Sequence, residues 1–318
     1  MSATDFAALE QYRSALTGHC YRMLGSVVDA EDAVQESLLR AWKGIAGFHQ
    51  QSSLKTWLYR IATNVCLDTL ATSKRRWRPV TLSPPSAVHP AVELTQRERE
   101  HWVEPIPDAL ALPESADPQE LAILTESIRL AFVAALQYLP PRQRAALLLT
   151  QVLAFSAEET AETLNMSVPA VTSALQRARA TLDARNPVTT PRPLSSEQCE
   201  LLTRYVDAFE RYDIPALCDL LRADVQFSMP PFELWIQGPT SVSQWLLGFA
   251  RECRGSHLVP VAACGGTPAF GQYHDQGATP WALVLLEIQD QKISSITSFL
   301  DTQTLFPRFG LPMQWPKP

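Results

Sequence analysis

Apolar residues recur at helical spacing through residues 5 to 76, which predicts a bundle of amphipathic helices in this region. The first helix stops at Gly25, because glycine readily adopts the left-handed conformation that follows many helices. The second covers residues 25–42, and the third begins at Ser52 or Ser53 as its N-cap. The apolar face of the third helix comprises Leu54, Trp57, Leu58, Ile61, Ala62, Val65 and Leu70.

Periodicity is weak from residue 77 to 118, where proline and acidic residues accumulate, and this composition predicts a linker. Trp102 and Ile106 are two apolar side chains with which the linker can dock on a folded part of the chain. Helical patterning returns at residues 119–185, which we expect to form a second all-α domain.

The pattern changes again after the proline-rich residues 185–194. Residues 195–318 begin with two helical segments, contain a third near 239–250, and include several strand-like runs. These runs are residues 224–229, 257–264, 268–274, 281–289 and 292–300, with a hairpin turn expected at 289–291. Helices followed by strands predict an α+β domain, so we expect a multidomain chain.

Composition limits the class of protein. The 318 residues are 46% apolar and 19% charged, as in soluble globular proteins. The six cysteines are scattered without a C-x-x-C pair, which argues against a zinc site and a disulfide framework. No signal peptide or membrane span is evident, so we expect a cytoplasmic protein without membrane association, metal or cofactor.

Charge is unevenly distributed along the chain. The formal net charge is −6, yet Lys74, Arg75, Arg76 and Arg78 form a basic cluster just before an acidic stretch. Because a local patch sets the electrostatic footprint of a nucleic-acid site, the negative total does not exclude DNA binding.

Residues 155–182 have the spacing of a helix-turn-helix motif, in which the second helix enters the DNA major groove. Ser156 and Glu159 form a capping box for the first helix. The candidate DNA contacts are Ser167, Pro169, Ala170, Thr172, Ser173, Gln176, Arg177 and Arg179. Thr172 and Gln176 suit base edges, and the two arginines suit phosphates. An ordinary αα-hairpin is the alternative.

The third N-terminal helix offers another candidate DNA surface. Its polar side chains Arg60, Thr63, Asn64 and Asp68 lie off the apolar face, and the helix runs into the basic cluster. Trp57 and Tyr59 can stack on unpaired bases, although we assign Trp57 to the core. In the preceding loop, Phe48 and His49 are freer to meet an extruded base.

Carboxylates are concentrated at the start of the second helix, in Asp29, Glu31, Asp32 and Glu36. A metal site needs a second acidic motif facing them, and no suitable helix carries one. A solvated helix face is a simpler alternative, supported by a Glu36–Arg40 pair at i, i+4. Leu39 lies among the polar residues of this stripe, whereas Trp42 turns mostly toward the core, so the stripe is more typical of a protein-docking surface.

Residues 19–42, 48–70 and 139–182 together resemble regions 2 and 4 of the extracytoplasmic-function (ECF) sigma factors of the sigma-70 family. The resemblance covers residues 5–185, with region 2 at 5–76, the linker at 77–118 and region 4 at 119–185. It implies core RNA polymerase and promoter DNA as partners, the polymerase being held through its β′ clamp helices and β flap. An anti-sigma factor is a further possible partner of such a chain.

The resemblance also implies roles for individual residues. Region 2.2 binds the clamp helices, which corresponds here to Asp29, Asp32, Gln35, Glu36 and Leu39. Regions 2.3 and 2.4 melt and read the −10 element, which corresponds to Phe48, His49, Arg60, Asn64, Lys74, Arg75 and Arg76. The helix-turn-helix reads the −35 element, and the linker threads toward the RNA exit path. Thr172 and Ala174 stand where many members have arginine, which puts the promoter sequence in question.

Residues 195–318 resemble a SnoaL-like domain, the cone of the ketosteroid-isomerase-like fold, and thereby the sigma-G/sigma-J type of ECF factor. Such cones often enclose a ligand pocket. Phe249 and seven further residues are candidates to line it: Met229, Trp235, Trp245, His257, Tyr273, Trp281 and Asp301. The alternative is that the aromatic residues fill a core and Asp301 caps a turn.

These features favour a non-enzymatic transcription initiation factor with a built-in regulatory domain. Two other functions remain as alternatives: a ligand-sensing one-component DNA-binding regulator, and a SnoaL-like enzyme with a helical appendage. The enzyme leaves two DNA-type helical modules unexplained, and the one-component regulator leaves the N-terminal helices without a role.

Overall fold

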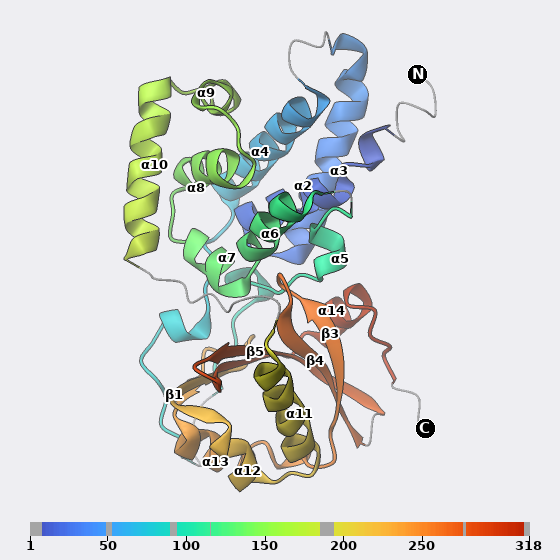
Figure 1. Cartoon of the computed structure of the whole chain (residues 1–318), viewed down its shortest axis with the longest axis vertical. Helices are drawn as coiled ribbons and strands as arrows, with labels where there is room; N and C mark the ends of the chain where they lie inside the picture. The colour runs from blue at the N-terminus through green and yellow to red at the C-terminus, as the bar shows by residue number, and fades with distance from the viewer. Residues whose placement is uncertain are drawn as a thin grey trace. The chain divides into compact units, whose positions relative to one another are not determined.

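The computed structural model describes residues 8–48, 53–89, 94–114, 116–184, 194–275 and 278–314. The chain divides into two compact units (Figure 1). The helical unit comprises Met1–Arg76 and Val103–Thr189, and the α+β unit comprises Trp77–Trp102 and Thr190–Pro318. The chain therefore passes between the two units three times.

The first part of the helical unit contains α2 (Arg13–Leu24), α3 (Val27–Gly44), the short η1 (Ile45–Gly47) and α4 (Leu54–Thr72). Gly25 ends α2 with φ 73°, as the sequence predicts. The side chains of Ser26 and Ser53 cap α3 and α4 by accepting hydrogen bonds from the Asp29 and Thr56 amides.

The second part of the helical unit follows in chain order. It contains α5 (Asp108–Ala111), α6 (Pro118–Ser127), α7 (Leu130–Leu136), α8 (Pro141–Leu147), the π-helical η4 (Leu148–Val152), α9 (Ala157–Leu164) and α10 (Val168–Asp183). α5, α7 and α8 pack on α2, and α8 and α9 pack on α4. The two helical groups that the sequence separates by a linker thus share one core.

Buried polar contacts join these two groups. Tyr21 donates its hydroxyl hydrogen to the Glu104 carbonyl oxygen at 2.7 Å, and Ser26 donates to the Glu104 carboxylate at 2.6 Å. Arg144 donates to the Met23 carbonyl oxygen and, at 2.7 Å, to the side-chain oxygen of Gln137. Since buried polar groups cost free energy unless they are hydrogen-bonded, these pairs fix how the helices pack.

The α+β unit is built on a six-stranded sheet of order β2-β1-β6-β5-β4-β3, in which β1 and β6 are parallel and the other neighbours antiparallel. The strands are β1 (Leu221–Ser228), β2 (Trp235–Gln237), β3 (His257–Ala263), β4 (Thr267–His274), β5 (Thr279–Gln289) and β6 (Lys292–Phe299). Asp290 and Gln291, both with positive φ, make the predicted hairpin turn between β5 and β6.

Helices cover both faces of this sheet. α11 (Ser196–Glu210), α12 (Ile214–Asp219), α13 (Pro239–Leu247) and the short η5 (Arg251–Cys253) share one core with the sheet. α14 (Thr302–Arg308) packs on the opposite face, where Phe306 meets Tyr273 edge to face at 5.2 Å. The predicted α+β class is confirmed, whereas β2 and α14 are short elements that the sequence patterns do not predict.

Residues 77–102 accompany the sheet rather than the helices, and we call the described parts of this segment, 77–89 and 94–102, the strap. The strap contains η2 (Pro79–Thr81) and η3 (Arg99–His101), and Trp77 pairs with Trp102. The Trp235 indole donates to the Ser83 carbonyl oxygen at 2.8 Å, and the Ser86 amide donates to the Trp235 carbonyl oxygen at 2.8 Å.

The remainder of the expected linker, from Val103 onward, belongs to the helical unit. Trp102 and Ile106 are both buried, with exposed fractions of 2% and 0%. The segment expected as one linker is therefore folded in two halves on two different units.

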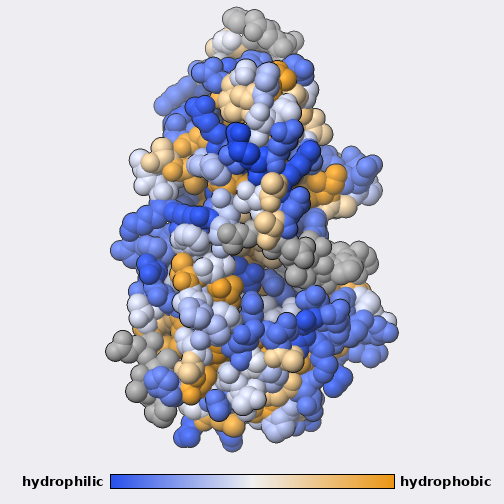
Figure 2. Space-filling model, turned by 90° about the vertical axis from the view of Figure 1, so that its left-hand side faces the viewer, coloured by the Kyte–Doolittle hydropathy of each residue, from blue (hydrophilic) through white to orange (hydrophobic). Residues whose placement is uncertain are grey.

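Polar side chains predominate on the face drawn in Figure 2, with small separated apolar areas between them. Within the described ranges, no helix combines the length and the apolar character that crossing a membrane requires. The six cysteines are free thiols, four of them buried, namely Cys20, Cys66, Cys253 and Cys264.

Candidate nucleic-acid interface and apolar cavity

The helix-turn-helix consists of α9 and α10. Ser156 and Glu159 form the capping box predicted for α9, and Asn165 makes the turn with φ 50°. The Ser167 side chain caps α10 by accepting from the Ala170 amide at 3.3 Å. These caps fix the residues at which α9 and α10 begin.

The predicted contact face of α10 points outward. Pro169, Thr172, Gln176, Arg177 and Arg179 are exposed, and Ser167 is exposed as the cap. Ala170 and Ser173 are half-buried, whereas the intervening Val171, Ala174 and Ala178 are buried. The Thr172 hydroxyl donates to the Val168 carbonyl oxygen at 3.2 Å, so while this bond is kept the hydroxyl can contact a base only as an acceptor.

The second candidate surface lies on α4 and the segment after it. Arg60, Asn64, Lys74 and Arg75 are exposed. The Arg60 guanidinium forms an ion pair with Glu162 of α9, and the Arg75 guanidinium lies 4.1 Å from the centre of the Tyr138 ring. Two of these cations therefore already contact the second part of the helical unit.

Two assignments on α4 are wrong because both of its sides are covered. Thr63 is fully buried and its hydroxyl lies 2.9 Å from His19 Nε2, so it is not on an open polar face. Tyr59 is 2% exposed and packs edge to face against Phe155, so it is not available to stack on bases. The sequence pattern of α4 does not reveal that α8 and α9 also pack on this helix.

The assignment of Arg76 to the DNA surface is also corrected. Its side chain is 5% exposed and its Nη2 lies 2.6 Å from the carboxylate of Asp29. Asp29 in the first turn of α3 is thus engaged with Arg76, and it does not belong to the open acidic surface predicted for that helix. This pair ties the chain after α4 to the start of α3.

The rest of the α3 stripe is accessible. Asp32, Gln35 and Leu39 are exposed, and Glu36 is half-buried and paired with Arg40 at 2.6 Å. Trp42, expected to turn mostly toward the core, is instead 42% exposed, as is Leu39. The stripe therefore combines carboxylates with two large apolar side chains, a composition typical of protein-docking surfaces.

Phe48 is half-buried, with its ring tilted against that of Trp57 at 5.0 Å. Trp57 is also only half-buried, at the edge of the core to which we assigned it. His49 lies outside the described residues.

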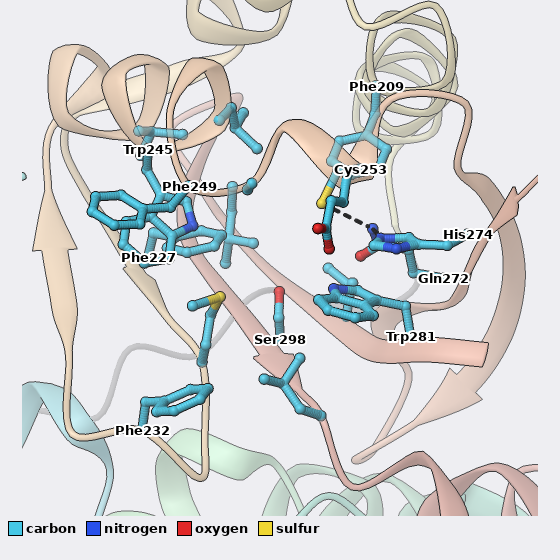
Figure 3. Close-up of a pocket in the computed structure, with 18 of the residues that line it drawn as sticks. Phe209, Phe227, Phe232, Trp245, Phe249, Cys253, Gln272, His274, Trp281 and Ser298 are labelled. Carbon is cyan, nitrogen blue, oxygen red and sulfur yellow. Dashed lines mark hydrogen bonds between the residues drawn. The ribbon is translucent and has the colours of Figure 1, made fainter. Parts of the chain in front are cut away.

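The α+β unit contains a cavity of about 560 Å³. It lies between the sheet and the helices that share its core, and aromatic side chains make up much of its wall (Figure 3). These aromatic residues are Tyr205, Phe209, Phe227, Phe232, Trp245, Phe249 and Trp281. A volume of this size is in the range that binds small organic molecules.

A small polar group interrupts the apolar wall. The Gln272 amide nitrogen lies 3.1 Å from Ser256 Oγ, 3.4 Å from Cys253 Sγ and 3.4 Å from His274 Nε2. His274 stacks on Trp281 with ring centres 4.1 Å apart. Burial lowers the pKa of His274, against the opposing effect of Asp275 and Glu252, and burial raises the pKa of the Cys253 thiol.

Three of the predicted pocket residues, Met229, Trp245 and Trp281, line this cavity, as does Phe249. The other four are engaged elsewhere, which corrects their assignment. Trp235 bonds to Ser83, His257 pairs with Glu210 at 2.9 Å, Tyr273 donates to the Pro312 carbonyl oxygen, and Asp301 caps α14 through the Thr304 amide. Asp301 is therefore the helix cap of the alternative interpretation.

Sequence reasoning did not identify Gln272 and Ser298 as residues of the cavity. Alternate residues of a strand point to opposite faces, so Gln272 and His274 of β4 line the cavity while Tyr273 between them faces α14. This alternation is present in the sequence. Which of the alternating residues face the cavity becomes evident only when the helices that cover each face of the sheet are known.

Comparisons with known proteins identify families for both parts of the helical unit. The Sigma-70 region 2 model matches residues 8–76, and the Sigma-70, region 4 model matches residues 129–182. The chain is 46% identical to the ECF RNA polymerase sigma factor SigG of Mycobacterium tuberculosis, over 97% of this chain and 84% of that protein. It is 32% identical to the ECF RNA polymerase sigma-E factor of Escherichia coli K12, over 49% of this chain and 72% of that protein.

Among solved structures, the crystal structure of the extracytoplasmic function sigma factor SigJ of Mycobacterium tuberculosis is similar in fold. It matches with a TM-score of 0.62 at 21% identity, covering 98% of this chain and all of that chain. The likeness of fold therefore includes the α+β unit as well as the helices.

Proposed function

The chain belongs to the ECF sigma factors of the sigma-70 family, non-enzymatic factors that direct transcription initiation by RNA polymerase, and on this premise we propose how its surfaces divide that work. α3 holds the polymerase, α4 with the residues after it reads the −10 element, and α10 reads the −35 element. The α+β unit regulates these activities in cis.

The polymerase-binding role of α3 is supported by its exposed stripe. Asp32 and Gln35 supply polar contacts, and Leu39 and Trp42 supply apolar area. Exposed aromatic and aliphatic side chains with charged neighbours are the usual elements of a protein interface. We assign this stripe to the β′ clamp helices, and the second part of the helical unit to the β flap.

The DNA-binding roles are supported by the exposed cations and amides. On α4 these are Arg60 and Asn64, followed by Lys74 and Arg75. On α10, Gln176 can pair with a base edge, while Arg177 and Arg179 lie where phosphates pass. Because α10 carries only two arginines, we expect it to contact few phosphates. The affinity for the −35 element should therefore depend only weakly on salt concentration.

One observation carries the regulatory proposal: the strap joins Arg76, at the end of region 2, to Val103, where the chain re-enters the helical unit, yet it folds with the α+β unit. Any rearrangement of regions 2 and 4 that moves these two ends must act on the strap. The α+β unit can therefore favour or oppose such a rearrangement without touching DNA or polymerase.

The test is transcription reconstituted from purified core polymerase and a promoter mapped for this factor. The full chain is compared with a chain that ends after residue 194, at equal concentrations. A changed amount of transcript with an unchanged start site supports regulation in cis. Equal transcription and equal promoter affinity of the two chains overturn it, and failure of both chains to direct specific initiation overturns the assignment of the DNA surfaces.

A further inference from the structure

The aromatic cavity contains an unused hydrogen-bond donor. Trp245 is 2% exposed, and among the described residues its indole Nε1 has no hydrogen-bond partner. Because buried polar groups in folded proteins are nearly always hydrogen-bonded, this N–H is open to an acceptor atom on a bound molecule. Trp245 lines the cavity together with Phe227 and Phe249, on the side opposite His274 (Figure 3).

The shape and chemistry of the walls restrict what can bind. Aromatic rings surround the space, with Trp245 stacked on Phe249 at 5.0 Å and His274 stacked on Trp281 on the other side. These walls suit a flat molecule that contains rings. Among the described lining residues there is no lysine or arginine, and Glu252 is present, so a carboxylate ligand has no counter-charge.

The cavity also has an open end. Leu94, Phe249 and Trp281 line it and are nevertheless 39%, 41% and 38% exposed. Large apolar side chains that line a cavity and still reach solvent lie where the cavity meets the surface. Leu94 belongs to the strap, so the strap forms part of this rim.

The loop of residues 229–234 is shared by the cavity and the strap. Met229 and Phe232 line the cavity, and the backbone of Phe232 pairs with Gln96 of the strap. On either side of this pair, the Glu233 amide donates to Thr95 and the Arg97 amide donates to Pro231, each at 3.0 Å. Arg97 also forms an ion pair with Glu233.

We propose that the cavity binds an uncharged, ring-containing small molecule with an oxygen atom that accepts a hydrogen bond from the Trp245 indole N–H. We further propose that binding of this molecule stabilises the contacts between loop 229–234 and the strap. A ligand against Met229 and Phe232 holds the loop in place, and the held loop retains the hydrogen bonds to Thr95 and Arg97. This inference rests on the proposed regulatory role, because it supplies the signal to which the α+β unit responds.

Binding is tested on the full chain with Nile red, an uncharged fused-ring dye that carries a carbonyl oxygen and brightens in apolar surroundings. The wild-type chain is expected to bind one equivalent. Trp245→Phe keeps most of the apolar ring and removes the N–H, and is expected to weaken binding about fivefold. Ser298→Leu, which fills the cavity, should abolish binding, and Leu247→Ala, at an exposed residue of α13 that does not line the cavity, is the control.

Charge selectivity is tested by displacing the dye with two molecules of nearly equal shape. 2-Acetylnaphthalene, a neutral ketone, is expected to displace Nile red at concentrations at least about tenfold lower than 2-naphthoate, its carboxylate counterpart. Equal displacement by both, or unchanged dye binding by both Trp245→Phe and Ser298→Leu, overturns the assigned ligand class and its site.

Transmission to the strap is tested by amide hydrogen exchange with and without saturating Nile red. Exchange is expected to slow in peptides that contain Glu233 and Arg97, the two amides that join loop and strap. Binding without any change in these peptides overturns the coupling. None of these three measurements contains polymerase or DNA, so all of them give an answer even if removal of residues 195–318 leaves transcription unchanged.

Discussion

Arg60 of α4 and Glu162 of α9 form an ion pair with Nη1 and Oε1 2.6 Å apart. The pair joins a residue proposed to contact the −10 element to the first helix of the helix-turn-helix. The proposed contact of Arg60 with the −10 element would therefore compete with its ion pair to Glu162.

Glu162→Gln is therefore expected to raise the affinity of the free protein for promoter DNA. Both side chains are largely exposed, and exposed ion pairs contribute at most about 1 kcal/mol, so the gain is about two- to threefold. Fluorescence anisotropy with labelled promoter DNA measures it. Glu158→Gln, also on α9 and exposed, removes the same charge without breaking the pair. An equal gain in Glu158→Gln would show that net charge alone is responsible.

The exposed stripe on α3 predicts a separate defect. Leu39→Ala and Trp42→Ala remove apolar contact area from a surface that is open in the free chain, so polymerase binding should weaken by about tenfold or more for the tryptophan. Protein stability should change little. The affinity for core polymerase is measured by titration, with Leu247→Ala as control, because Leu247 is 50% exposed on α13. Equal affinity of Trp42→Ala and the control contradicts the docking role of α3.

The close contact between α2 and α5 is tested by a glycine substitution. A Cβ on Gly18 would lie 2.4 Å from the carbonyl oxygen of Ala111, so the backbone of α5 must shift. Gly18→Ala is expected to lower the free energy of unfolding by about 1–3 kcal/mol, measured in urea. Gly47→Ala is the control, since no atom lies within 4 Å of the Cβ that it adds. A Gly18→Ala protein as stable as this control would contradict the close packing.

Sequence periodicity predicts most long elements here because each helix or strand buries one regular face. The capping serines and the α+β class follow from the same local rules. Periodicity does not predict features that depend on contacts between segments distant in the sequence. Thr63 and Arg76 look like surface residues in the sequence, and only the packing of His19 and Asp29 against them makes them buried.

The residues of the cavity are likewise predicted only in part from the sequence. The resemblance to a cone domain predicts a pocket lined with aromatic and a few polar residues, and Trp245 and Phe249 do line the cavity. Tyr273 and His257 were expected on the same grounds, but strand alternation and an ion pair place them elsewhere. The sequence does not predict where the strap folds, because the strap is held by hydrogen bonds and ion pairs to residues that are distant in the chain, such as Trp235 and Glu233.

Arg76 and Lys74 are expected to differ when each is replaced. Arg76→Met removes the partner of the Asp29 carboxylate in a mostly buried pair, and should lower the free energy of unfolding by about 3 kcal/mol. Lys74→Gln changes an exposed cation, and should leave stability unchanged while weakening promoter binding and reducing its dependence on salt. Urea unfolding and anisotropy at two salt concentrations separate the two effects. A stable Arg76→Met protein that loses only DNA affinity would restore Arg76 to the DNA surface.

His19 makes the stability of the helical unit depend on pH. Its ring is fully buried, and burial, with the nearby Arg22 charge, lowers the pKa of His19 from 6.5 to about 3. The unfolded chain therefore binds a proton below pH 6.5 that the folded chain does not, so stability falls as the pH falls from 6.5 toward 3. From pH 7 to pH 5 the free energy of unfolding is expected to fall by about 2 kcal/mol because of His19.

His19→Gln keeps a polar partner for Thr63 but cannot be protonated in this pH range. The free energy of unfolding of this variant should therefore lack the part of the pH dependence that His19 causes. Identical pH profiles for the two proteins, measured by urea unfolding at pH 5, 6 and 7, would show that the His19 ring is not neutral in the folded chain.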